Sequence, residues 1–167
     1  EEGGFYGAIA ASQSKAIAEN SVIVALEASR ELPNARLGDG VVLRVGDKTS
    51  IFTPWVTAMM RSAAEKLAKR KKGFRFQRRL MDGGTCESSI YTAFGYDAGG
   101  LCLPLRNYHN VDWKRMKLAA ECIDMRDYEA EVELLLELVK THGRDAGPID
   151  KSGQWKAFFK EHFSHVS

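Results

Sequence analysis

The run Ser21-Val22-Ile23-Val24-Ala25-Leu26 decides the fold of this chain. It is short, continuous and rich in β-branched residues, which is typical of a strand buried on both faces in an α/β protein. Glu27 follows the run directly, so we predict that its carboxylate stands at the C-terminal end of the strand. Open α/β sheets place their ligand sites there. A carboxylate in this place also suits a solvated loop or an ion pair with Arg30.

Alternating strand and helix patterns flank this run. Residues 7–18 are rich in alanine and suit a helix packed closely on a sheet. Further strand patterns occupy residues 41–45, 74–80 and 100–105, and further helix patterns occupy residues 53–72, 86–94 and 127–140. This alternation predicts a three-layer α/β/α sandwich.

The last part of the chain carries two amphipathic helix patterns. In residues 127–140 we expect one apolar face to cover the sheet, with glutamates opposite. The apolar set is Tyr128, Val132, Leu135, Leu136 and Val139, and the opposite set is Glu129, Glu133 and Glu137. In residues 148–167 we expect a final helix, docked on the body or on a neighbouring subunit. Its aromatic residues are Trp155, Phe158, Phe159 and Phe163.

Composition limits the possible classes of protein. The chain has 167 residues, 44% of them hydrophobic, which suits one domain over residues 1–167. A formal charge of +2 gives no overall field toward nucleic acid or an anionic membrane, so we expect neither as a partner. Three cysteines without a pairing pattern favour a reducing compartment, which we expect to be the cytoplasm.

One basic stretch needs an explanation that does not involve nucleic acid. Its residues are Lys66, Lys69, Arg70, Lys71, Lys72, Arg75, Arg78 and Arg79. Lysines and arginines at a helix C-terminus are favoured by the helix dipole, and no aromatic residues for base stacking alternate with them. We interpret the stretch as a solvated helix end.

Carboxylates and one imidazole stand at the ends of other predicted elements. The chain opens Glu1-Glu2-Gly3-Gly4-Phe5-Tyr6-Gly7-Ala8, and His109 follows the strand pattern at 100–105. In an extended pair one carboxylate can take a proton from a metal-bound water while its neighbour holds the metal. A solvated chain end and a hydrogen-bonded structural histidine are the ordinary alternatives. Together, Glu1, Glu2, Glu27 and His109 suit zinc, cobalt or manganese.

The order of these motifs resembles a known enzyme family. Glu-Glu-x-Gly-x-x-Gly-Ala, then Glu27, then Gly83-Gly84-Thr85, then Arg106-x-x-His109 is similar to the C-terminal half of the co-catalytic zinc aminopeptidases. These are the glutamyl or deblocking aminopeptidases that form tetrahedral particles, and the resemblance covers roughly residues 1–143. It implies a zinc-exopeptidase-like fold with a mixed sheet, and it implies a homo-oligomer that cleaves N-terminal residues from peptides.

The resemblance also implies a role for each matched residue. Glu1 would be the general base, Glu2 and His109 would bind one metal ion, and Glu27 would bind the other. The two ions would be zinc, with cobalt or manganese as alternatives. Residues implied to contact substrate are Gly83, Gly84, Thr85, Glu87 and Arg106.

The chain departs from the family pattern in three places. Glu27 stands where the family usually has aspartate, and related carboxypeptidases and N-acyl amino acid deacylases of the same fold carry glutamate there, so these activities stay open. Cys86 replaces the aspartate of Gly-Gly-Thr-Asp, and we interpret it as a small buried thiol. The family also needs an upstream histidine and a bridging aspartate, so we expect a missing upstream segment of the same catalytic domain. A non-catalytic assembly module is the third alternative.

Overall fold

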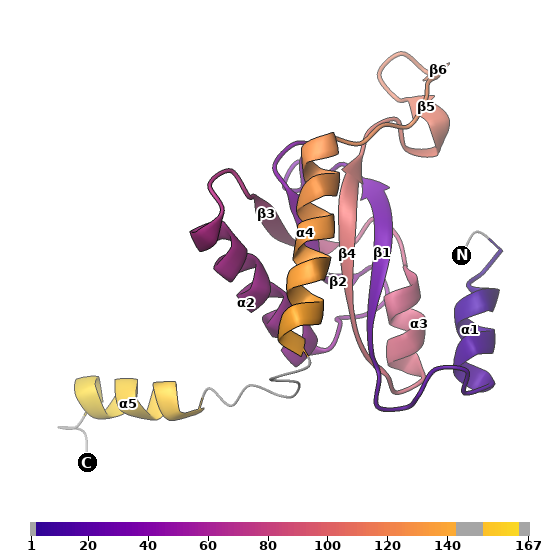
Figure 1. Cartoon of the computed structure of the whole chain (residues 1–167). Coiled ribbons are helices and arrows are strands. Elements are labelled where there is room, and N and C mark those ends of the chain that lie inside the picture. The colour runs from indigo at the N-terminus through magenta and orange to yellow at the C-terminus, as the bar shows by residue number, and fades with distance from the viewer. Residues whose placement is uncertain (1–2, 143–151, 164–167) are drawn as a thin grey trace.

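A four-stranded mixed sheet forms the middle layer of the computed structural model, which describes residues 3–142 and 152–163 (Figure 1). Its strands are β1 (Val22–Arg30), β2 (Val41–Asp47), β3 (Phe76–Met81) and β4 (Asp97–Leu105), in the order β1-β4-β2-β3. The pairs β1–β4 and β2–β3 are parallel, whereas β2 and β4 are antiparallel. The predicted mixed sheet is confirmed.

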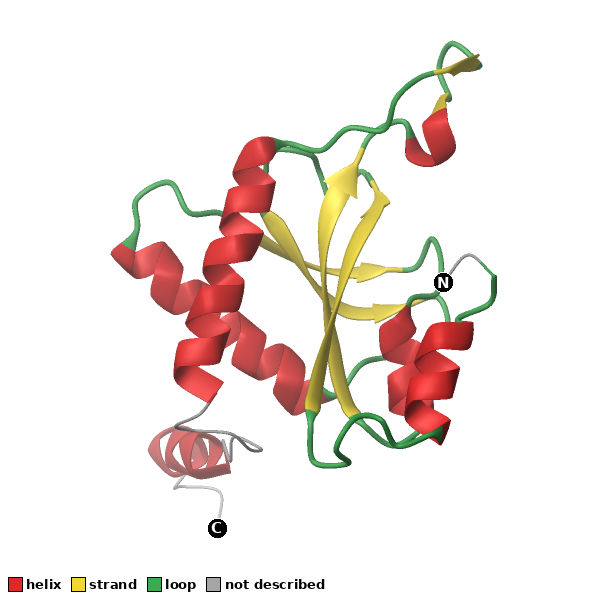
Figure 2. Cartoon of the chain, turned by 45° about the vertical axis from the view of Figure 1, so that its right-hand side comes forward, coloured by secondary structure: helices red, strands yellow, loops and turns green. Residues whose placement is uncertain are grey.

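Helices cover both sides of this sheet (Figure 2). Helices α2 (Pro54–Arg70) and α4 (Met125–His142) pack on one side, and α1 (Tyr6–Gln13) and α3 (Glu87–Ala93) lie on the other. After β4 the chain makes a 3-10 turn, Tyr108–Asn110, and a small hairpin of β5 (Val111–Asp112) and β6 (Lys117–Leu118). The predicted three-layer α/β/α sandwich is therefore confirmed.

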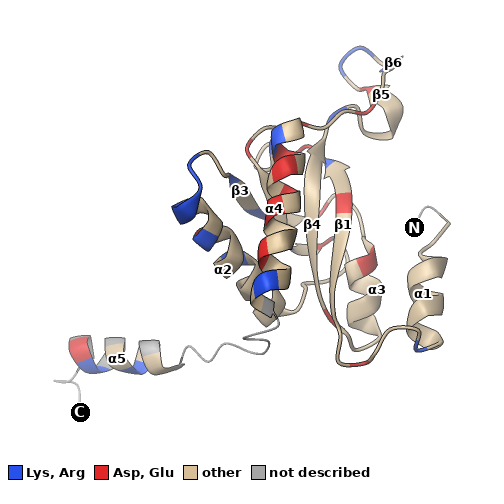
Figure 3. Cartoon of the chain, viewed as in Figure 1, with Lys and Arg blue, Asp and Glu red and all other residues tan. Residues whose placement is uncertain are grey.

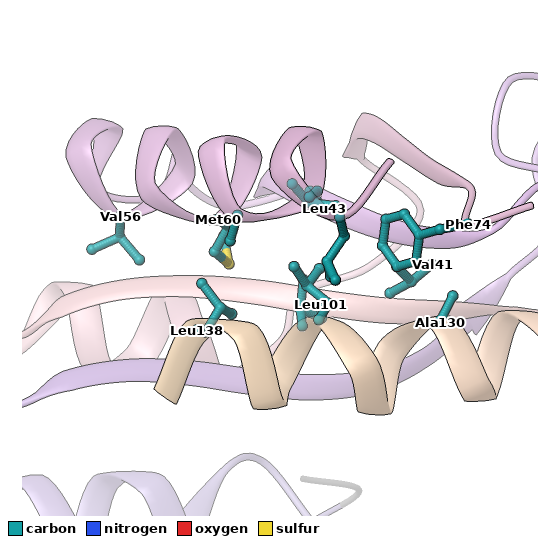
Figure 4. Close-up of a cluster of buried hydrophobic side chains, with 12 residues drawn as sticks. Val41, Leu43, Val56, Met60, Phe74, Leu101, Ala130 and Leu138 are labelled. Carbon is teal, nitrogen blue, oxygen red and sulfur yellow. The ribbon is translucent and has the colours of Figure 1, made fainter. Parts of the chain in front are cut away.

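The main hydrophobic core lies between the sheet and helices α2 and α4 (Figure 4). Val41, Leu43 and Leu101 reach it from the strands, Val56 and Met60 from α2, and Ala130, Leu134 and Leu138 from α4. Helix α2 begins with Pro54 at its first turn, where a proline costs no hydrogen bond. Because one side of the sheet is filled by apolar side chains, any polar site must lie on the other side or at an end.

The basic end of α2 contacts the acidic surface of α4. Arg70 donates to Glu137 at 2.9 Å, and Lys71 bonds to Glu133. Figure 3 shows basic residues at the end of α2 and acidic residues along α4. These two basic residues thus pair the helices with each other.

Strand β1 differs from its prediction. It continues through Glu27 to Arg30, and it lies at an edge of the sheet, with 54% of Leu26 exposed. The expectation of a strand buried on both faces and ending before Glu27 is therefore wrong. The central strand β4 is the doubly covered one, since Ala98–Leu105 are all buried. An edge strand can continue past a charge because one of its sides opens to water.

The predicted buried face of α4 is also wrong except at Leu135, which is partly buried against the main core. Tyr128, Val132, Leu136 and Val139 are all exposed, and 78% of Val139 is accessible. The buried positions are instead Asp127, Ala130, Glu131, Leu134, Glu137 and Leu138. Acidic side chains occupy buried positions because the backbone of the 38–40 loop and the side chain of Arg70 bind two of them.

The ends of the chain add three further results. Helix α1 ends at Gln13, before the expected Ala18, and the hydroxyl of Ser12 bonds back to the carbonyl of Ala8. A helix α5 (Ser152–Phe163) lies within the predicted range 148–167, and its docking stays a prediction. Within the described residues, no helix has the length and apolar character needed to cross a membrane.

Candidate functional site

A pocket of about 160 Å³ opens beside β1 on the α3 side of the sheet. Glu27 and Ser29 line it from β1, Arg44 from β2, and Gly83 and Gly84 from the loop after β3, together with Thr85 and Tyr108. Glu27 is in register with Cys102, and Cys102 with Val42, which places all three on this side. The fold thus brings Glu27 and the Gly83-Gly84-Thr85 turn into one pocket, although 56 positions separate Glu27 from Gly83 in the sequence.

Asp47 fixes the position of the glycine turn. Its carboxylate accepts hydrogen bonds from the Cys86 amide at 2.8 Å, the Ser89 hydroxyl at 2.7 Å, and the amides of Thr49 and Ser50 at 2.7 and 3.0 Å. Burial alone would raise the pKa of the Asp47 carboxyl, but these hydrogen bonds outweigh burial and hold that pKa below its ordinary value. The end of β2 and the start of α3 are therefore joined by one ionised side chain.

Sequence reasoning missed Asp47, although a signal was present. An aspartate followed by amides two and three residues later, here Thr49 and Ser50, forms the local turn that aspartate favours. The second oxygen reaches Cys86 and Ser89, which are far away in the sequence, and only the fold shows that contact.

Arg44 is the second residue that sequence reasoning missed. It interrupts the apolar pattern of β2, and it is buried in the floor of the pocket, with only 2% of the residue exposed. Its Nη1 donates to the Ser29 hydroxyl at 3.3 Å, and its guanidinium carbon lies 6.0 Å from the centre of the Phe52 ring. A charged residue inside a buried strand pattern was the available signal.

Two buried thiols lie near Arg44. Burial raises the pKa of Cys86 to about 11 and that of Cys102 to about 12, against an opposing effect of the Arg44 charge. Both thiols are therefore protonated at neutral pH. The interpretation of Cys86 as a small buried thiol is confirmed, because only 1% of the residue is exposed.

His109 lies next to the pocket without lining it. It is exposed, its backbone adopts the left-handed region with φ 61°, and its amide donates to Glu121 at 2.7 Å. Its ring stacks on Tyr108 with 4.0 Å between centroids, and Tyr108 does line the pocket. The expected pairing of His109 with Glu2 stays a prediction, because Glu1 and Glu2 lie outside the described residues.

Two further predicted residues, Glu87 and Arg106, do not line the pocket. Glu87 is the first residue of α3 and is half-buried. Arg106 is exposed at the end of β4 and lines a neighbouring hollow with Arg30 and Trp113. Across residues 3–142 and 152–163, the structure contains no group of three histidine, cysteine, aspartate or glutamate side chains that could hold a metal ion.

Solved structures with a similar architecture include aminopeptidases. PhTET1, described as a dodecamer, matches with a TM-score of 0.65 at 23% identity over 83% of this chain and 38% of its own. The TET aminopeptidase of Thaumarchaeota archaeon SCGC AB-539-E09 matches with a TM-score of 0.64 and 19% sequence identity. The match covers 84% of this chain and 38% of that protein. Aminopeptidase APDkam598 of Desulfurococcus kamchatkensis matches with a TM-score of 0.61 and 25% sequence identity. The match covers 83% of this chain and 38% of that protein.

These matches show which fold the chain has and how much of each solved protein it corresponds to. The fold is that of the zinc exopeptidases, as predicted, and the chain spans 38% of the length of these three solved proteins. A search of curated proteins finds no match. The family model of the M42 glutamyl aminopeptidases matches residues 1–134. The chain therefore belongs to the M42 glutamyl aminopeptidase family.

Proposed function

We propose that this chain supplies part of the active site of a metal-dependent aminopeptidase that hydrolyses N-terminal residues of peptides. The observation that carries the proposal is the shared pocket of Glu27 and the Gly83-Gly84-Thr85 turn, in a chain of the M42 family. Because both features come from motifs far apart in the sequence, their meeting at one edge of the sheet supports a common role.

The available side chains suit zinc in their chemistry. Glu27 offers carboxylate oxygens inside the pocket, and the exposed His109 beside Tyr108 offers an imidazole nitrogen. Oxygen and nitrogen ligands of this kind also bind cobalt and manganese. Two such ions, when bound, would lower the pKa of a water ligand and polarise the scissile carbonyl. We assign Glu2 and His109 to one ion and Glu27 to the other.

The remaining steps fall to the protein's own groups. Glu1 would accept the proton of the attacking water, since a carboxylate that binds no metal can act as a general base. The Gly83-Gly84-Thr85 turn would hold the peptide, because Asp47 fixes its position against β2. Glu87 and Arg106 are assigned to the outer part of the substrate site.

The proposal also includes an oligomeric state and a cellular compartment. The similar protein PhTET1 is a dodecamer, and we propose a homo-oligomer for this protein too. Cys86, Cys102 and Cys122 are all free thiols, which supports a reducing compartment, and we propose the cytoplasm.

The experiment uses a protein that contains the complete catalytic domain, assayed with aminoacyl anilides. Glu27→Ala should lower turnover at least about 100-fold and reduce bound metal, since metal stabilisation of the transition state amounts to several kcal/mol. Glu1→Gln should abolish turnover and leave the metal content unchanged. Glu65 of α2, which is half-buried and pairs with Arg61 away from the pocket, is the matched control, and Glu65→Ala should behave as wild type.

Two results would contradict the assignment. Full activity of Glu27→Ala would remove Glu27 from the site. Hydrolysis of N-acyl amino acids in preference to aminoacyl anilides would point instead to the deacylase activity that a glutamate at this position leaves open.

A further inference from the structure

Helix α4 presents a row of apolar side chains on its outer surface. The row consists of Tyr128, Val132 and Leu136, which are 45%, 39% and 55% exposed. They are four residues apart, so they lie one above another on a single face of the helix. Leu134 and Leu138, which belong to the main core, lie on the other side of α4. The row is therefore an apolar surface that the core of the chain does not use.

An acidic edge runs along this row. Glu129 and Glu133 each follow a member of the row by one residue, which places both on the same side of it. Glu129 is exposed, and Glu133 keeps 30% of its side chain accessible while it pairs with Lys71. Lys140 follows Val139 on the same side, so the edge becomes basic near the end of the helix. A basic partner is thus favoured beside the row and disfavoured beside Val139.

Helix α5 has a matching pattern. In its sequence Trp155, Phe159 and Phe163 are four residues apart, and 65% of Trp155 is exposed. Lys156 and Lys160 follow the first two of these by one residue, and both are exposed. Helix α5 therefore combines an aromatic row with a basic edge, where α4 combines an apolar row with an acidic edge.

The two charged edges meet when the helices run antiparallel. In a right-handed helix, the residue that follows a member of a row lies about 100° further around the axis, always in the same sense. When two rows face each other, these following residues lie on the same side for antiparallel helices and on opposite sides for parallel ones. Antiparallel packing therefore sets Lys156 beside Glu133. It sets Lys160 beside Glu129 in the same register, because both pairs are spaced by four residues.

The position of α5 leaves the row on α4 open. Figure 1 shows α5 beyond the C-terminal end of α4, and the three residues of the row are exposed. The α5 of a second copy can therefore occupy the row. A two-fold axis makes this contact twice, because each copy provides one α4 and one α5. The family model matches residues 1–134, so α5 lies outside the part of the chain that it covers.

We propose that this chain forms a two-fold dimer in which α5 of each copy packs antiparallel on the exposed row of α4 of the other copy. In the register that pairs Lys156 with Glu133, Trp155 enters between Val132 and Leu136, as a knob between two residues of the facing helix. This inference names an interface for the proposed homo-oligomer, but it rests on the two helices and not on the peptidase activity.

The test measures the molar mass of the 167-residue chain over a series of concentrations, by light scattering after size exclusion and by sedimentation velocity. Wild type should be a dimer. Val132→Glu puts a charge into the row, and Trp155→Glu removes the aromatic anchor, so each should raise the dissociation constant at least about 100-fold. Val139→Glu is the matched control, since it adds the same charge to α4 beyond the contact, and it should dimerise as wild type. Circular dichroism checks that each variant is folded.

A mixture of two variants tests the exchange of helices between copies. Val132→Glu keeps an intact α5, and Trp155→Glu keeps an intact α4, so one of the two contacts is restored in their heterodimer. The mixture should therefore associate at least about tenfold more tightly than either variant alone. A dimer held together through other surfaces gives no such rescue.

Charge reversal tests the antiparallel register. Glu129→Lys and Lys160→Glu should each raise the dissociation constant by about tenfold, because each replaces an attraction with a repulsion in both contacts. The two changes together should restore most of the affinity of wild type. Equal weakening without restoration would remove this pair from the contact.

Three outcomes would overturn the proposal. The first is a monomeric wild type at concentrations up to about 1 mM, which includes the case in which α5 covers its own α4. The second is an unchanged dimer in folded Val132→Glu and Trp155→Glu, and the third is a mixture that associates no more tightly than its components. If Val132→Glu does not fold, unchanged dimerisation of both Glu129→Lys and Lys160→Glu overturns the proposal instead. Because these measurements use no substrate, a failure of the peptidase assay is distinguishable from a failure of this inference.

Discussion

The two sides of the sheet bury different kinds of side chain. Toward α2 and α4, Leu43 and Leu101 lie in one apolar cluster with Leu138 of α4 (Figure 4). Toward α3, Arg44 and Asp47 are buried beside polar partners and an open pocket. The strands alternate between the two sides residue by residue, so neighbours such as Leu43 and Arg44 belong to different environments. One side supplies stability, and the other places charged groups.

The largest expected effect lies on the apolar side. Leu134 of α4 is fully buried, and Leu134→Ala should lower the free energy of unfolding by about 2–5 kcal/mol, because it removes apolar contacts and leaves a cavity. Chemical denaturation monitored by circular dichroism measures this loss.

Val139 provides the control on the same helix. Its side chain is 78% exposed, so Val139→Ala should change the free energy of unfolding by no more than about 0.5 kcal/mol. Equal losses for the two variants would contradict the assignment of buried and exposed faces on α4.

The next effect lies on the polar side. Asp47→Ala removes the acceptor of four hydrogen bonds and leaves the Cys86 amide without its partner, so it should cost about 3 kcal/mol. The pKa of Asp47 is lowered in the folded protein, so its contribution is present above the ordinary value of 3.8 and is lost as the pH falls through the folded value.

Asp47→Asn sharpens this test. The amide keeps the size of the side chain and loses the titration, so its stability should depend less on pH below about 4 than that of wild type. Denaturation midpoints at a series of acidic pH values measure the difference. A parallel pH dependence in the two proteins would remove Asp47 as a source of acid sensitivity.

The sequence predicted the order of strands and helices better than it predicted which face of a helix is buried. Strand and helix alternation, the Gly83-Gly84-Thr85 turn and the start of α3 are local patterns, and each is confirmed. The faces of α4 failed because apolar residues occur on two sides of this helix, and periodicity alone does not tell which side meets the sheet. Only tertiary contacts decide between them.

The same limit applies to the candidate site. Glu27, which the sequence singled out, lines the pocket, but β1 continues three residues past it, and its role as a metal ligand stays a prediction. Arg44 and Asp47 were missed because their significance depends on burial and on partners distant in the sequence. The order of the motifs in the sequence was enough to identify the family, whereas the charged groups of the pocket could be identified only from the three-dimensional structure.

The most diagnostic effect concerns the three buried acids of α4. Asp127 accepts from the amides of Gly38 and Gly40, and Glu137 accepts from Arg70, but Oε1 of Glu131 has no hydrogen-bond partner among the described residues. Burial raises the pKa of Glu131 from 4.5 to about 7. Among these three acids, Glu131 is therefore the one with a buried carboxylate oxygen that no described residue satisfies.

Glu131→Gln should stabilise the protein only where the carboxyl would otherwise lose its proton. The unfolded chain releases this proton near pH 4.5 and the folded chain near pH 7, so wild-type stability falls as the pH rises between these values, by at most about 3 kcal/mol. The melting temperature of the variant should be higher than that of wild type at pH 8 and equal to it at pH 4.

Glu137→Gln is the control. Glu137 is equally buried, but this change weakens the bond from Arg70, so the melting temperature should be lower than that of wild type at pH 8. A gain of stability in both variants would mean that any charge on this face is unfavourable, and a loss in both would mean that Glu131 has found a partner in solution.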